Sequence, residues 1–135
     1  MARQKGDDRA LGPMAPVGRL AFDQVSWSTG EGHAAATTIR YVNMTIDRID
    51  VLISSVTANP TVNLTFADDN SVTIIDATNF TGLADGTKHT LWAKKATADF
   101  TEVSVNGEVT VTVDPSADPG GSDQVLTVDV IFYGR

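Results

Sequence analysis

The sequence predicts an all-β domain, a two-sheet antiparallel sandwich of about eight strands with an extended N-terminal arm. Apolar and polar residues alternate along most of the chain from residue 19 onward, and "TVNLTFA" at residues 61–67 is the clearest example. Turn residues separate the alternating segments at intervals of about 8–12 residues. No segment shows a sustained helical period. The topology, jelly-roll or immunoglobulin-like, stays open at this point.

The first strand segments each carry one apolar face, because side chains two positions apart lie on the same side of a strand. The shared faces are Leu20 with Phe22, Ile39 with Tyr41, and Ile49 with Val51 and Ile53. In residues 87–95 the same period places His89 and Leu91 on one face and Trp92 and Lys94 on the other.

The pair Asn106-Gly107 in "TEVSVNGEVTVTV" indicates a hairpin. A two-residue loop would put Val103 opposite a threonine. A three-residue loop puts Val103 opposite Val109 and makes one face of the sheet apolar. We therefore expect the odd-length loop, with Gly107 left-handed in a bulge.

Residues 125–133 form a nearly continuous apolar run, "VLTVDVIFY". Such a run is typical of a strand that is covered on both faces. The simpler interpretation is a central strand of the sandwich. The alternative is that its second face packs against another subunit.

Charge is distributed unevenly along the 135 residues, which are enough for one domain. The net charge is −7, but residues 1–19 carry four basic and two acidic residues, a net of +2, and the remainder carries a net of −9. An acidic body repels nucleic acid and anionic membranes, so neither is expected as a partner. No apolar run resembles a secretory signal or a membrane span, and there is no cysteine, so synthesis in a cytosol is expected.

Residues 1–18 are predicted to be an extended arm, and residues 19–135 the β-sandwich domain. An arm gains contacts over a long path without a core of its own, and only an extensive partner surface offsets the entropy of ordering it. Apolar arm residues suit grooves on that partner, and basic ones suit acidic patches. The candidate contact residues are Arg3, Lys5, Arg9, Leu11, Met14 and Val17.

The chain contains no recognised nucleophile, phosphate-binding or dinucleotide-binding motif, so no enzyme and no cofactor is predicted. His33 and His89 are interpreted as a loop residue and a packed or edge residue of a strand. Calcium prefers clustered oxygen ligands. The loop with Asp114, Asp118 and Asp123 is one acidic cluster, but it lacks the spacing of a calcium loop. The second cluster is Asp68, Asp69 and Asn70. Acidic turns also serve simply to solvate loops, and no metal site is predicted.

Trp27 and Trp92 raise the alternative of a carbohydrate-binding or adhesion module, because such modules display aromatic platforms. Aromatic residues make up only 7% of the chain, so no dense aromatic row is expected. Each tryptophan is more simply a core or interface residue.

As a whole, the chain resembles the capsid decoration, or cement, proteins of bacteriophages. The resemblance is carried by the arm "MARQKGDDRALGPMAPVG", by the strand series "TVNLTFADDNSVTII" and "GEVTVTV", and by the terminal strand "LTVDVIFYGR". It implies a non-catalytic virion protein, commonly a homotrimer, on the outer surface of the shell. It further implies that the arm runs along the major capsid protein and ties neighbouring capsomers together. A phage tail or head–tail connector component is a further alternative, and oligomeric state separates the two.

Overall fold

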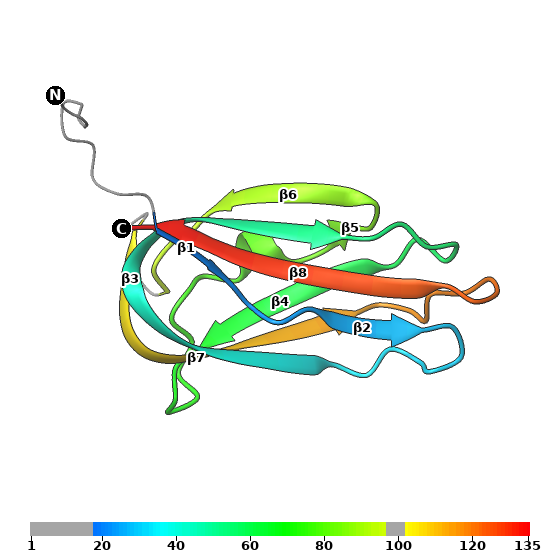
Figure 1. The fold of residues 1–135 in the computed structure, drawn as a ribbon, viewed down its shortest axis with the longest axis horizontal. Coiled ribbons are helices and arrows are strands. Elements are labelled where there is room, and N and C mark those ends of the chain that lie inside the picture. The colour runs from blue at the N-terminus through cyan, green and yellow to red at the C-terminus, as the bar shows by residue number, and fades with distance from the viewer. Residues whose placement is uncertain (1–17, 97–101) are drawn as a thin grey trace, which may run out of the picture.

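The computed structural model describes residues 18–96 and 102–135, and these form an all-β structure with a single 3₁₀ turn (Figure 1). The elements in chain order are β1 (Gly18–Ala21), β2 (Val25–Ser28), β3 (Ala36–Ile53), β4 (Thr61–Ala67), η1 (Thr78–Phe80), β5 (Leu83–Ala84), β6 (Thr87–Trp92), β7 (Val103–Pro115) and β8 (Val125–Gly134).

All eight strands belong to one hydrogen-bonded sheet with antiparallel pairs. Its main path runs β1-β8-β3-β7-β4-β5, while β2 also pairs with β8 and β6 also pairs with β3. The prediction of an antiparallel all-β fold is confirmed. The division into two separate sheets is not, because the 18-residue strand β3 bends and continues from one side of the molecule to the other, so that the sheet curls into a half-barrel (Figure 1).

Strand β3 changes partners along its length. Its first part, residues 36–46, pairs with β7, and its second part, residues 46–53, lies between β6 and β8. The register against β8 shifts between Ile46 and Arg48, which leaves Asp47 as an extra residue in a bulge. Before the bulge the buried residues are even-numbered, such as Val42 and Ile46. After it the buried apolar residues are Ile49, Val51 and Ile53.

The expected hairpin at Asn106-Gly107 is wrong. Strand β7 continues through both residues, which lie opposite Asn43 and Val42 of β3, and Gly107 does not have a positive φ. The apolar face that favoured an odd loop arises without any turn, because odd-numbered valines of one continuous strand share a face. The real partner of this segment is β3, which is remote in sequence.

The core lies on the concave side of the curled sheet. The Phe132 ring of β8 lies 4.8 Å from that of Phe22 and 5.9 Å from that of Phe66 in β4, and Phe66 lies 4.9 Å from Phe80 of η1. Because β8 and β4 are separated by two strands along the sheet, this contact shows that the inner faces meet across the curl.

The C-terminal strand β8 lies inside the sheet, with β1 and β2 on one side and β3 on the other, but only one of its faces is buried, so the expected cover on both faces is wrong. Its inward side chains, including Val130 and Phe132, are buried. At its end Gly134 pairs with Gly18 and approaches β3 so closely that a Cβ there would lie 1.8 Å from the carbonyl oxygen of Thr45. The chain that enters β1 therefore does so beside the end of β8.

Ile39 and Tyr41 do share a face of β3, as expected, but it is the solvent face. They are 54% and 61% exposed, whereas Thr38 and Val42 point to the core. The Tyr41 hydroxyl donates a hydrogen bond to Asn106 Oδ1 at 2.5 Å.

Candidate functional site

The six candidate contact residues of the arm lie outside the described residues. They are Arg3, Lys5, Arg9, Leu11, Met14 and Val17. The structure does place the residue to which they connect. Gly18 begins β1 and pairs with Gly134, next to the carboxyl end of β8 (Figure 1).

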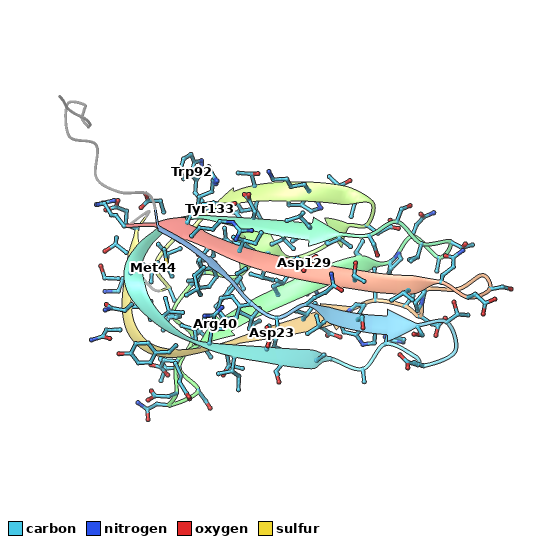
Figure 2. All side chains as sticks on the ribbon, viewed as in Figure 1. Asp23, Arg40, Met44, Trp92, Asp129 and Tyr133 are labelled. Atoms are coloured by element: carbon cyan, nitrogen blue, oxygen red, sulfur yellow. The ribbon has the colours of Figure 1, made fainter. Side chains whose placement is uncertain are left out.

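Four side chains lie in one row across the outer face of the sheet at this end. Trp92 of β6 is the register partner of Arg48 of β3, Arg48 is the partner of Tyr133 of β8, and Tyr133 is the partner of Arg19 of β1. We call these four residues the Trp92 row. Strands lie about 4.8 Å apart, so the row spans about 14 Å. Figure 2 shows Trp92 and Tyr133 together near the start of β1.

The row faces outward because the adjacent row faces inward. The next register partners, Leu91, Ile49, Phe132 and Leu20, contribute to the core or pack against it. Side chains of successive residues point to opposite faces of a strand. Trp92 is consequently 67% exposed. The bulge at Asp47 is what turns Arg48 outward after an inward Ile46.

The Arg48 side chain is held on two sides. Its guanidinium carbon lies 4.1 Å from the centre of the Tyr133 ring, a cation–π geometry. Its Nε lies 3.4 Å from Oδ1 of Asp50, an ion pair without hydrogen-bond geometry. Oδ2 of Asp50 lies 3.5 Å from Nζ of Lys88, and the Asp50 side chain is only 3% exposed. Two cations therefore cover one buried carboxylate on the outer face.

Within residues 18–96 and 102–135 the terminal nitrogens of Arg48 form no hydrogen bond, and its side chain is 39% exposed. Arg135, a second arginine at this end, forms ion pairs with acidic side chains. Arg135 lies 2.7 Å from Glu102 and 3.3 Å from Asp47, and these contacts raise the pKa of Arg135 and lower the pKa of Glu102. Arg135 ties the bulge and the residue before β7 to the C-terminus, whereas the Arg48 side chain carries a planar guanidinium and stays partly exposed to solvent. A guanidinium fork suits a carboxylate.

The two tryptophans differ clearly in their exposure to solvent. Trp27 is 6% exposed, and its Nε1 donates a hydrogen bond of 2.8 Å to the carbonyl of Ala34. It is therefore a core residue and no sugar platform. Trp92 is exposed instead, on the face of β6 opposite Leu91.

The remaining candidates serve the structure. His33 and His89 each lie within hydrogen-bond distance of a backbone carbonyl, those of Pro115 at 3.2 Å and Ala84 at 2.9 Å. In the described part of the chain, no three or more His, Asp or Glu side chains are grouped as metal ligands. The described residues also include no helix with the length and apolar character of a membrane span.

Asp118 clamps two loops together. Its Oδ1 accepts the N–H of Gly120 at 2.8 Å, and its Oδ2 accepts those of Gly30 and Gly32 at 2.9 and 3.0 Å. These backbone donors, with Gly120 and Gly32 the largest contributors, hold the pKa of Asp118 below its ordinary value of 3.8.

Replacement of this carboxylate is expected to weaken the fold in a pH-dependent way. A lowered folded-state pKa stabilises the fold above pH 3.8, and the stabilisation is lost as the pH falls through the folded-state pKa. Asp118→Asn should therefore have a lower urea midpoint than the parent at neutral pH, and the two should converge in strong acid. Asp69→Asn, at an exposed turn residue, is the control. Equal midpoints of Asp118→Asn and the parent at neutral pH contradict the clamp.

The Trp92 row was missed at the level of sequence. The period of the strand separated Trp92 from Leu91, but it could not identify the strands that lie beside β6. The only available signal was the change in the parity of apolar residues between Ile46 and Ile49 without an intervening turn, which marks a bulge.

Comparison with known proteins gives no family assignment, since no family model and no curated protein matches this chain. Among solved structures, a chain of the cyanophage Pam1 capsid asymmetric unit is similar with a TM-score of 0.46 and 18% identity over 99% of both chains. A chain of infectious bursal disease virus, Gt strain, is similar with a TM-score of 0.43 and 9% identity over 87% of this chain. This chain spans 32% of that viral chain's length. At these values the similarities define no functional relationship.

Proposed function

We propose that this chain is a virion structural protein that decorates and cements the outer surface of a bacteriophage capsid. The observation that carries the proposal is that the attachment point of the basic arm and the Trp92 row lie at the same end of the molecule. Gly18 pairs with Gly134, and Arg19, the next residue, is a member of the row. An arm and an exposed aromatic and basic row at the same end suit a protein that binds a surface through that end.

The opposite end of the molecule is acidic. Loops 29–35, 54–60 and 116–124 and the turn at 85–86 carry Glu31, Asp85, Asp118 and Asp123, with no Lys or Arg. Hydrogen bonds join these loops, for example Val56 N–H to Asp85 and Gly30 N–H to Asp118. Val125 and Tyr133 mark the two ends of β8, about 27 Å apart. In this proposal the end with the arm contacts the capsid and the acidic end faces solvent. An acidic, solvated surface helps to keep an abundant protein soluble.

In this proposal the partner is the major capsid protein and the role involves no catalysis. The protein is a homo-oligomer, with a trimer favoured, and subunit contacts add to those of the arm. Many weak copies acting together give avidity on a repetitive shell. The location is the virion surface, after synthesis in the host cytoplasm.

Removal of residues 1–17 is expected to abolish binding to capsids while the domain stays folded. A chain that starts at Gly18 keeps every described strand pair. In cosedimentation with phage heads that lack this protein, its binding should weaken by about a hundredfold or more, because the tethered contacts are lost.

The matched control for this truncation replaces residues 1–17 by a Gly/Ser segment of equal length, which restores length without the arm's side chains. Circular dichroism verifies the fold of each chain. Normal head binding by the chain that starts at Gly18 contradicts the role of the arm.

The exposed Trp92 favours a second candidate, a carbohydrate-binding module. In that case tryptophan fluorescence should respond to glycans in the parent and not in Trp92→Ala. No response across a broad glycan panel rules against it.

A further inference from the structure

We infer that the Trp92 row is a docking surface for a carboxylate-bearing patch of the same capsid protein surface to which the arm binds. The inference rests on the proposed function and deepens it, because it assigns the folded domain its own contact with the partner. Arg48 is the central side chain of this contact, and Trp92 is its apolar neighbour.

Arg48 is prepared for a ligand before any partner arrives. The Tyr133 ring lies 4.1 Å from its guanidinium carbon, and Asp50 faces its Nε at 3.4 Å. A guanidinium fixed in this way loses little rotational freedom when it binds, so less of the binding energy is offset by ordering.

The chemistry of the row selects a carboxylate beside an apolar group. Arginine forks bind carboxylates with two parallel hydrogen bonds, and such charge-assisted bonds are stronger than neutral ones. Arg19 and Lys88 add positive charge on the same face, although the chain as a whole is acidic with a net charge of −7. Trp92 offers a largely exposed ring. Trp, Tyr and Arg are the residue types that dominate the energy of protein interfaces.

The position of the arm identifies the occupant. Residue 17 is bonded to Gly18, and Gly18 is adjacent to Arg19 of the row, so the arm leaves the domain at the row's edge. Seventeen residues reach at most about 61 Å when fully extended. A partner surface that holds the arm therefore lies within this reach of the row.

The test measures binding of full-length variants to phage heads by cosedimentation. Trp92→Ala removes an exposed ring, and Arg48→Lys keeps the charge over Asp50 while it removes the fork. Each is expected to raise the dissociation constant by about thirtyfold. The matched control is Tyr41→Ala, which removes an equally exposed ring on the first part of β3 and should leave head binding unchanged.

The outcomes separate this inference from the proposed function. If the chain that starts at Gly18 loses binding while Trp92→Ala and Arg48→Lys bind as the parent does, the docking surface is wrong and the role of the arm stands. If the parent itself does not bind heads, both are wrong. If Trp92→Ala changes the oligomeric state measured by light scattering without heads, the row is a contact between copies and the inference is overturned. A fluorescence response of Trp92 to glycans, with unchanged head binding, also overturns it.

Discussion

Phe132→Ala is expected to lower the free energy of unfolding by about 4 kcal/mol, since phenylalanine-to-alanine changes in cores cost about 3–5 kcal/mol. The ring is fully buried and contacts both Phe22, which follows β1, and Phe66 of β4. It therefore links strands on the two sides of the curled sheet. Its loss removes apolar burial and leaves a cavity that two neighbouring rings cannot both fill.

Equilibrium urea unfolding of Phe132→Ala and of the parent measures this difference. Tyr41→Ala is the control, because it removes an aromatic ring that is 61% exposed and should change stability by about 0.5 kcal/mol. A similar small loss in Phe132→Ala contradicts the view that the sheet closes over this ring.

Local periodicity predicted the faces of individual strands well. The placement of Trp92 on the face opposite Leu91 and the shared face of Ile49, Val51 and Ile53 follow from the spacing of residues along a strand, and the structure confirms both. These features depend only on which neighbours in the chain share a side of a strand. Burial of one face is enough to fix them.

Which strands pair with each other could not be predicted in the same way. Asn106-Gly107 has the residue types of a tight turn, yet β7 passes straight through it because a long β3 offers a partner on the side of Val42 and Asn43. Turn propensity is a local preference of limited strength, whereas the ladder between β3 and β7 is a tertiary arrangement that overrides it. Because β3 is one long strand that pairs with β7 and then with β8, the sheet is continuous where two separate sheets were expected.

The candidate site likewise combines features that sequence predicts with features that depend on strand pairing. Trp92, Arg48, Tyr133 and Arg19 come from four strands, and only the register of those strands places them in one row. Sequence could place Trp92 on the face opposite Leu91 but could not identify its neighbours on the adjacent strands. The proposed contacts of the arm, such as Arg3 and Leu11, depend on a partner and stay predictions.

The bulge at Asp47 connects the fold to this candidate site. Val42 and Ile46 point inward before it, and Ile49, Val51 and Ile53 point inward after it. Since side chains alternate along a strand, one extra residue is needed to bury both sets. The same extra residue turns Arg48 outward between Trp92 and Tyr133.

Deletion of Asp47 is therefore expected to prevent this fold from forming. In a regular ladder one of the two inward sets must turn to solvent, which exposes for example Ile49, Val51 and Ile53 at a cost of roughly 6 kcal/mol. That is comparable to the whole stability of a typical domain, about 5–15 kcal/mol. Loss of the β-sheet signal in circular dichroism and rapid proteolysis are the expected results.

Asp47→Asn is the control. It keeps the residue count and gives up only an exposed ion pair with Arg135, so it should fold like the parent. A deletion variant as stable as Asp47→Asn shows instead that β3 adjusts its register elsewhere, and the outward position of Arg48 then has another origin.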